Sequence, residues 1–373
     1  MPRYVIDEKA LRRNLEILKD VSKRSGARIL LAQKAFSAGC TYPLLAEYLD
    51  GTTSSSLFEA MHAHKGFPGE VHIFNPAYSE GEIDVILGLA DHIVFNSPRQ
   101  VKLHAAKALA RGVSTGLRVN PEVQVATTPA YDPCRPGSRL GTVRANLDAF
   151  PEDVTGLIEG LHFHCLCEQG LDELKKVLAG FEERFGDLIG RMKWINFGGG
   201  HHITRKDYDV DGLVELISSF RSRHNGVIVY LEPGEAVALD AGTLESRVLE
   251  IQPRGADGVS NAILDVSAAC HMPDVLEMPY TPRVAGAKIG AEGPFVYRFG
   301  GPTCLAGDEI GTYSFGAPLK EGDEVVFEDM AIYSMVKNNT FNGINLPDIA
   351  YRREDGQVET VRTFGYEDFA SRL

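Results

Sequence analysis

Short runs of apolar and β-branched residues recur along the first 235 residues, and longer stretches with helical spacing separate them. Eight of these runs predict β-strands: Arg28–Ala32, Leu49–Ser54, Val71–Asn75, His92–Asn96, Gly116–Asn120, Gly160–His164, Lys193–Phe197 and Val227–Glu232. Between them, Glu59–Lys65, Pro98–Arg111 and Asp172–Phe185 carry apolar residues three and four positions apart, which is typical of amphipathic helices. This alternation predicts an α/β fold, a (β/α)8 TIM-type barrel whose catalytic face lies at the carboxyl ends of the strands.

The pattern changes after Gly234, where shorter strand-like runs are separated by Gly, Pro and Asp turns. These runs are Val248–Gln252, Ala262–Val266, Pro294–Phe299, Glu324–Phe327 and Gln357–Phe364. They predict a second, mostly β domain in the C-terminal part of the chain. An opening strand, Arg3–Ile6, precedes a helix over Glu8–Ser25 and could pair with that domain. We therefore expect a barrel over residues 8–235 and a β domain built from residues 1–7 and 236–373.

Composition and charge narrow the class of protein. Apolar residues make up 44% and charged residues 24% of the 373 residues, as in globular proteins in water. No apolar signal-peptide core opens the chain, no uncharged run approaches a membrane span, and the six cysteines show no framework spacing, so we expect a cytoplasmic, reduced protein. A net charge of −13 argues against nucleic acid and anionic membranes as partners. It would suit a cationic substrate, although many cytosolic enzymes are acidic for solubility alone.

Three features at predicted strand ends carry candidate chemistry. Lys34 follows the first strand, where partial desolvation would lower its pKa and make the amine reactive, although most lysines in such places are simply solvated. Gly198, Gly199 and Gly200 follow the seventh strand, where barrel enzymes often bind phosphate through backbone N–H groups; the alternative is a flexible turn. Glu232 precedes a Pro-Gly turn that favours a positioned side chain, and could keep a cofactor's pyridine nitrogen protonated or be a surface carboxylate.

His164, at the end of the sixth predicted strand, could stack on the face of a cofactor ring. With His162, Cys165 and Cys167 nearby, the segment also suggests a metal site. In a strand, however, residues 162 and 164 point to one face and residues 165 and 167 to the other, so the four cannot converge on one ion. Their spacing also differs from that of zinc fingers. We therefore expect no bound metal.

In the predicted β domain, Cys304 and Asp308 share the glycine-rich segment GGPTCLAGDEIG. A buried structural cysteine and a turn aspartate explain this pair at least as well as a catalytic role does. Tyr333, further along the chain, could be a core tyrosine or a phosphate ligand.

The order of these features resembles that of one known family. The ordered features are Lys34, His164, Gly198–Gly200, Glu232-Pro-Gly, Gly-Pro-Thr-Cys304 and Tyr333 followed by Phe341-Asn342-Gly343. This order resembles the alanine-racemase-like (fold type III) pyridoxal phosphate (PLP) decarboxylases, which include ornithine and diaminopimelate decarboxylases. Within that family, segments such as DGTTSSSLFEA, GLHFHCLCE, NFGGGHHITR and EPGEAVALDAG are similar to those of carboxynorspermidine/carboxyspermidine decarboxylases. The resemblance spans nearly the whole chain; each motif alone is weak, but their joint order is specific.

The resemblance implies a set of contacts with PLP. Lys34 is the covalent anchor of the cofactor, His164 stacks on its ring, and Glu232 pairs with the pyridine nitrogen. Arg118, in GLRVNP, lies near the phenolic oxygen of the ring. The implied phosphate contacts are Gly198, Gly199, Gly200 and Tyr333.

The resemblance also implies the reaction and the oligomeric state. The expected reaction is decarboxylation of carboxynorspermidine, carboxyspermidine or both to the polyamine. Cys304 is expected to return a proton to the carbon that loses CO₂, and to reach the active site from the second subunit of a homodimer. Asp308 is expected beside it, near the amines of the substrate.

Two departures bear on the substrate. Ornithine and diaminopimelate decarboxylases follow Glu-Pro-Gly with arginine, where this chain has Glu235, and they place an acidic residue after the cysteine, where it has Leu305. Both departures argue against ornithine and diaminopimelate. The segment with His271 and Asp274 is rich in acids and could face distal ammonium groups, or be an ordinary polar loop. The expected substrate contacts are Glu235, His271, Asp274 and Asp308.

Three other functions stay open. A related decarboxylase could act on ornithine or diaminopimelate despite the departures. A PLP-binding protein without turnover is less compatible with residues 236–373, because such proteins generally lack a second β domain. A metal-dependent barrel hydrolase is the third possibility. The sequence does not choose between carboxynorspermidine and carboxyspermidine, because these substrates differ by one methylene.

Overall fold

The computed structural model describes residues 1–253 and 255–373. The chain forms two compact units, one of residues 14–237 and one of residues 1–13 together with 238–373. The helix α1 (Glu8–Ser25) runs from one unit into the other. The domain boundaries expected from the sequence, at residues 8 and 235, stay a prediction.

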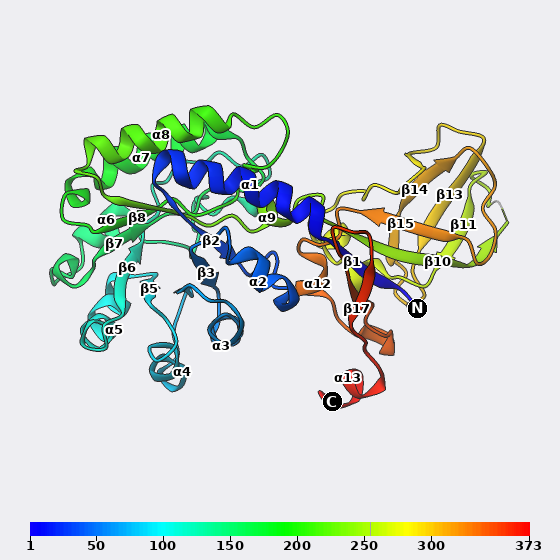
Figure 1. The fold of residues 1–373 in the computed structure, drawn as a ribbon, viewed down its shortest axis with the longest axis horizontal. Helices are drawn as coiled ribbons and strands as arrows, with labels where there is room; N and C mark the ends of the chain where they lie inside the picture. Colours follow the sequence, from blue (N-terminus) through cyan, green and yellow to red (C-terminus); the bar gives the residue numbers. More distant parts are fainter. Residues whose placement is uncertain (254) are drawn as a thin grey trace. The chain divides into compact units, whose positions relative to one another are not determined.

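The unit of residues 14–237 is a closed barrel of eight parallel strands, which confirms the predicted fold class (Figure 1). Its strands are β2 (Arg28–Ala32), β3 (Gly51–Ser54), β4 (Glu70–Phe74), β5 (His92–Phe95), β6 (Ser114–Arg118), β7 (Gly160–His162), β8 (Trp194–Asn196) and β9 (Ile228–Leu231). Neighbouring strands pair in sequence order, and β9 closes the barrel on β2 through the neighbours Tyr230 and Arg28. All eight predicted strands are present, with ends that differ by a few residues.

Helices follow the strands and cover the outside of the barrel (Figure 1). They are α2 (Tyr42–Leu45), α3 (Leu57–Gly66), α4 (Glu80–Ile86), α5 (Pro98–Ala110), α6 (Arg144–Asp148), α7 (Leu171–Ile189), α8 (Val210–Arg223) and α9 (Glu235–Ala238). Each long helix buries one face; in α7 this face includes Leu174, Leu178, Phe181 and Phe185 at helical spacing. Some of these helices have an N-cap side chain with a hydroxyl group. In α5, Ser97 Oγ accepts a hydrogen bond from the backbone N–H of Gln100.

Trp194 fills part of the barrel interior and fixes the residues opposite it. Its ring packs with Leu30, Val94 and Tyr230. A Cβ atom on Gly160 would lie 2.1 Å from the indole, and one on Gly116 would lie 2.3 Å from it. Only glycine therefore leaves room for the indole on these two strands.

The second unit is built on a nine-stranded sheet with short helices. Its strands are β1 (Arg3–Asp7), β10 (Gly242–Gln252), β11 (Ser260–Leu264), β12 (Lys288–Ile289), β13 (Phe295–Gly300), β14 (Glu309–Phe315), β15 (Glu324–Glu328), β16 (Asp348–Arg352) and β17 (Val358–Arg362). The short helices are α10 (Ala268–His271), α11 (Asp274–Glu277), α12 (Ser334–Lys337) and α13 (Tyr366–Ala370). As expected, the opening strand pairs with this unit, antiparallel to β10 and parallel to β16.

The sequence missed three strands of this sheet: β12, β14 and β16. β14 carries polar or glycine residues at Gly311, Thr312 and Ser314, so its apolar alternation is weak. Pairing with β13 from Phe295 to Gly300 stabilises β14 instead, and that pairing depends on tertiary structure. In the part of the chain that the model describes, no helix combines the length and apolar character needed to cross a bilayer.

Candidate active site

Lys34 and His164 meet at the carboxyl end of the barrel strands. Lys34 Nζ lies 3.3 Å from His164 Nε2, and the backbone N–H of Gly199 donates a hydrogen bond to His164 Nδ1 at 3.0 Å. Because a backbone N–H can only donate, Nδ1 carries no proton, and a neutral His164 ring has its proton on Nε2. The contact with Lys34 is then a donation from the imidazole to an unprotonated amine.

The surroundings favour these two protonation states. Burial, followed by nearby positive charge such as that of Arg118, lowers the pKa of His164 well below its usual range. Water reaches the Lys34 side chain, yet protein surrounds it closely enough that burial, then the charge of Arg118, lowers its pKa. The guanidinium of Arg118 donates to the carbonyl oxygen of His164 at 2.9 Å and lies 4.5 Å from the ring centre of Phe74. The structure therefore brings Lys34, Arg118 and His164 together; their roles toward a cofactor stay predictions.

The Glu232 carboxylate contacts side chains from two neighbouring strands, β7 and β8. His162 Nε2 lies 3.1 Å from Glu232 Oε2, and the Asn196 amide donates to Glu232 Oε1 at 2.8 Å. Burial opposes ionisation of Glu232, but the adjacent imidazole, its hydrogen bond and the Asn196 amide outweigh burial and lower the pKa to about 2. Burial lowers the pKa of His162, so we assign a neutral ring that donates to the carboxylate. Glu232 is a fixed anion at neutral pH.

The three glycines form a tight backbone loop against the next strand end. Gly198 and Gly200 have φ of +70° and +85°, a region that favours glycine. A Cβ on Gly199 would lie 2.0 Å from the carbonyl oxygen of Glu232. Among the described residues, no atom accepts from the backbone N–H of Gly200 or of Gly234. Unpaired N–H groups in a close-packed glycine loop suit an anion such as phosphate.

Sequence reasoning missed His162, Asn196 and His202. His162 and Asn196 are neighbours in the registered pair β7–β8, directly before the loops that hold His164 and the glycines. Matching polar residues at the same level of adjacent predicted strands were the available signal. His202 lies 3.2 Å, Nε2 to Oε2, from Glu235, which the sequence had assigned to substrate. That substrate role of Glu235 stays a prediction.

In the sheet unit, Cys304 lies on a loop that is anchored at two points. Its thiol side is exposed, while its backbone N–H donates to Asn342 Oδ1 at 2.9 Å. Asp308 is buried and accepts from Thr303 Oγ1 at 2.6 Å, from Ser267 Oγ at 2.9 Å and from the backbone of Ala269. Asp308 therefore shapes the loop that carries Cys304; its expected contact with substrate amines stays a prediction.

The remaining predicted residues of this unit are also engaged within the chain. Buried His271 accepts from the Ser267 N–H at Nδ1 (3.1 Å) and donates from Nε2 to the Asn345 carbonyl (3.0 Å). Asp274 pairs with the ammonium group of Lys337. Tyr333 has φ of +54°, unusual for a bulky residue and typical of positions under functional constraint. Their substrate and phosphate roles stay predictions.

Two other features of the described residues carry no assigned ligand. Glu70, His72 and His92 each offer a ligand atom within 4.8 Å of the others, but the two imidazoles stack at 4.0 Å and 7°, so one ion cannot lie in both ring planes. Arg28 also binds Glu70, at 2.5 Å.

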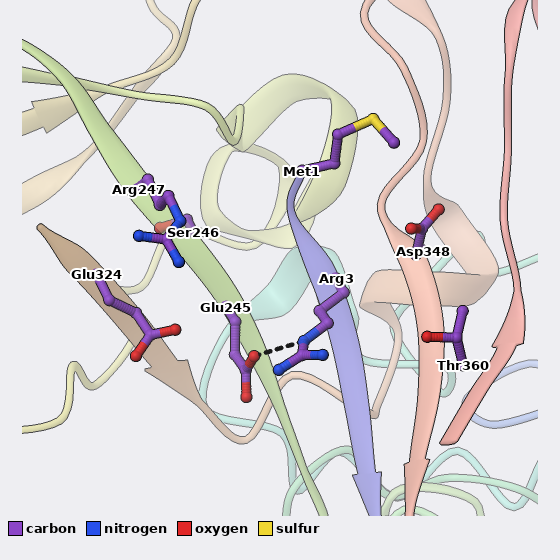
Figure 2. A pocket seen from close by; sticks show the side chains of 8 residues that line it. All are labelled: Met1, Arg3, Glu245, Ser246, Arg247, Glu324, Asp348 and Thr360. Carbon is purple, nitrogen blue, oxygen red and sulfur yellow. Dashed lines mark hydrogen bonds and ion pairs between the residues drawn. The ribbon is translucent and has the colours of Figure 1, made fainter. Parts of the chain in front are cut away.

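A cavity of about 340 Å³ in the sheet unit is lined by Met1, Arg3, Glu245, Ser246, Arg247, Glu324, Asp348 and Thr360 (Figure 2). An Arg3–Glu245 ion pair of 2.6 Å crosses it, and it contains no predicted site residue.

Comparison with known proteins assigns the family. The model of the family described as "Pyridoxal-dependent decarboxylase, C-terminal sheet domain" matches residues 3–331. The chain belongs to the pyridoxal-dependent decarboxylases. A carboxynorspermidine/carboxyspermidine decarboxylase of Campylobacter jejuni is 44% identical to this decarboxylase over 100% of the chain and 98% of its own length. A carboxyaminopropylagmatine decarboxylase of Synechocystis is 41% identical over 100% of the chain and 95% of its own length.

Solved structures agree on the fold of this decarboxylase. A crystal structure of carboxynorspermidine decarboxylase complexed with norspermidine, from Campylobacter jejuni, matches with a TM-score of 0.91 and 42% identity over the whole of both chains. Diaminopimelate decarboxylase of Helicobacter pylori matches with a TM-score of 0.84 but only 18% identity, over 100% of this chain and 96% of its own, which shows a shared fold alone. PLP is the cofactor of the family, and the Lys34 amine, the fixed Glu232 anion and the glycine loop fit it.

Proposed function

We propose that this decarboxylase removes the carboxylate of carboxynorspermidine, carboxyspermidine or both, to give the polyamine. The observation that carries the proposal is the pair of full-length relatives with that name, at 44% and 38% identity. The net charge of −13 is compatible with a substrate that carries several ammonium groups.

Bound PLP would accept the electron pair that stays on the α-carbon when its bond to the carboxylate breaks. The protein residues prepare that chemistry. If the Lys34 amine accepts the His164 N–H, it is unprotonated, and its single electron pair can attack a carbonyl carbon once that hydrogen bond is given up. Burial, and after it the positive charge of Arg118, 2.9 Å from the His164 carbonyl, lowers the pKa of this amine. We assign Lys34 as the anchor and His164 as the residue that both orients it and stacks on the ring.

Glu232 supplies a permanent negative charge for the pyridine nitrogen. Its pKa of about 2 means that it stays ionised when a cationic nitrogen approaches, so the proton remains on the ring and not on the carboxylate. We assign the phosphate to Gly198, Gly199, Gly200 and Tyr333, with free N–H groups at Gly200 and Gly234 in support.

Cys304 is our proposed proton donor to the carbon that has lost CO₂. Its exposed thiol on an anchored loop is compatible with a donor that completes a site in a second subunit of a homodimer. Cys304→Ala should keep cofactor absorbance but lose most of its product formation. Light scattering of the purified chain tests the dimer, and a monomeric, fully active protein would exclude the shared site.

We also propose a cytoplasmic location, for which fractionation of cells is the direct measurement.

A second substrate has specific support. The 41% identical relative from Synechocystis is a carboxyaminopropylagmatine decarboxylase, so identity alone does not separate the two substrate groups. Ornithine and diaminopimelate are disfavoured by Glu235 and Leu305 and by the 24% identity to a diaminopimelate decarboxylase.

The deciding experiment is a substrate panel with CO₂ release as the readout. It contains carboxynorspermidine, carboxyspermidine, carboxyaminopropylagmatine, ornithine and diaminopimelate. We expect the highest kcat/KM for one of the first two compounds. A higher value for any of the other three would replace the proposed substrate, and absence of CO₂ from all five would argue for a different reaction. Because one methylene is worth about 1–3 kcal/mol in a pocket, the first two should differ by no more than about 200-fold.

A further inference from the structure

The loops that follow β8 and β9 are joined along their length. Near their start, the backbone N–H of Glu232 donates to the Gly198 carbonyl at 2.7 Å, and Gly199 packs on the Glu232 carbonyl. Further on, Thr204 Oγ1 donates to the Ala236 carbonyl at 2.6 Å. The unpaired N–H groups of Gly200 and Gly234 belong to these two loops, one to each. An anion held by both groups therefore depends on the spacing of the loops.

The ion pair between His202 and Glu235 joins the loop after β8 to the first residue of α9, which directly follows the loop after β9. His202 follows the glycine loop by two residues, and Glu235 directly follows Gly234. Their side chains are 11% and 20% exposed, and Nε2 and Oε2 are 3.2 Å apart. Such a pair is partly shielded from water, so its charges act more strongly than those of a fully exposed pair.

The charge at position 235 raises a specific difficulty for a phosphate site. Glu235 directly follows Gly234, one of the two residues whose backbone N–H is unpaired, so this chain has an anion beside the proposed phosphate loop. A carboxylate next to a loop that binds a phosphate dianion repels it unless a cation compensates. Among the described residues, His202 forms an ion pair with Glu235.

The groups around His202 favour its cationic form. Burial opposes protonation, but the Glu235 carboxylate 3.2 Å away, with the charge of Glu168, outweighs it and raises the pKa of His202; Arg205 acts in the opposite direction. Two more titratable neighbours interact with it: His201, whose pKa is lowered to about 3 so that it adds no charge, and the carboxylate of Asp207. The balance of these neighbours is negative.

We infer that His202 is a positioning residue for the cofactor phosphate, which in its protonated form neutralises Glu235 and holds the loops after β8 and β9 at the spacing of a phosphate cradle. Cofactor affinity then falls as the pH rises through the pKa of His202, because the pair becomes a lone carboxylate beside the phosphate.

The test measures binding of PLP and of pyridoxal, which lacks the phosphate, to cofactor-free protein by absorbance titration between about pH 6 and pH 9. His202→Gln should weaken PLP binding about tenfold near neutral pH, since it leaves an uncompensated charge. It should leave pyridoxal binding unchanged. His202→Gln/Glu235→Gln should restore PLP binding to within about threefold of the wild type, because the repulsion is gone. His202→Lys should bind PLP well and lose the pH dependence.

A matched control is available on the outside of the barrel. His224 Nε2 lies 2.8 Å from Glu182 Oε1 in a pair whose side chains are 20% and 27% exposed, so His224→Gln should leave both affinities unchanged. Thermal melting of the cofactor-free variants separates weak folding from weak binding. The inference would be overturned if His202→Gln lost equal affinity for PLP and for pyridoxal, or if the double variant did not recover PLP affinity. Wild-type PLP affinity in His202→Gln at every pH would overturn it as well.

Discussion

The bond between His162 and Glu232 gives the sharpest prediction about the active site. His162 is buried, and its Nε2 lies 3.1 Å from the Glu232 carboxylate, while Asn196 binds the other oxygen. Replacing His162 with leucine keeps an apolar volume against Phe74 and removes the donor. The buried carboxylate then retains a single side-chain donor.

The size of the effect follows from the pKa of Glu232. The interval between its usual value of 4.5 and about 2 corresponds to about 3 kcal/mol in favour of the carboxylate. A hydrogen bond to a charged group contributes about 1.5–3 kcal/mol, so His162→Leu should raise the pKa of Glu232 by about one to two units. It should also reduce the free energy of unfolding by about 2 kcal/mol at pH 7.

The pH dependence has a definite sign. The pKa of Glu232 is lower in the folded chain than in the unfolded chain, so its contribution to stability is present above pH 4.5 and is lost as the pH falls towards 2. In His162→Leu the folded-state pKa of Glu232 is higher. The stability that this variant loses on acidification should therefore be smaller, and the loss should be complete at a higher pH. Urea unfolding of cofactor-free protein at pH 7 and at pH 4 measures it, and His162→Gln, which keeps an N–H donor, should recover part of the stability. An unchanged unfolding free energy in His162→Leu would refute the argument that this bond keeps Glu232 ionised.

Three further predictions follow from the barrel. Lys34→Ala should abolish the visible absorbance of bound cofactor and the release of CO₂; retained absorbance with full turnover would exclude Lys34 as the anchor. Gly199→Ala should weaken PLP binding at least about tenfold in titrations, because its Cβ would lie 2.0 Å from the Glu232 carbonyl, whereas Gly186→Ala, with nothing within 4 Å, should bind normally. Burial and the charge of His72 lower the pKa of His92 to about 3, so the unfolded chain binds a proton below pH 6.5 that the folded chain does not. Stability should therefore fall between pH 6.5 and 3 in chemical unfolding, and fall less in His92→Gln.

The barrel was predictable because its signal is local. Strands β2 to β9 are short, mostly buried runs of apolar, β-branched or small residues, and the long helix α7 between them buries apolar residues at regular spacing. The sheet unit was only partly predictable. β14 and β16 have weak alternation and are stabilised by partners distant in sequence: β16 pairs with β1 from Arg3 to Asp7. Strand pairing of this kind is set by register, which a single segment does not encode.

The sequence by itself determined which residue types stand at the ends of the barrel strands. Lys34, His164, the three glycines and Glu232 were found because the carboxyl ends of parallel strands meet at one rim, whatever the details of packing. The tertiary structure decided their states and their partners. The tautomer of His164 depends on the N–H of Gly199, 35 positions away, and the charge of Glu232 depends on His162, 70 positions away. Protonation depends on burial and on neighbours within a few ångströms, and these neighbours come together only when the barrel closes.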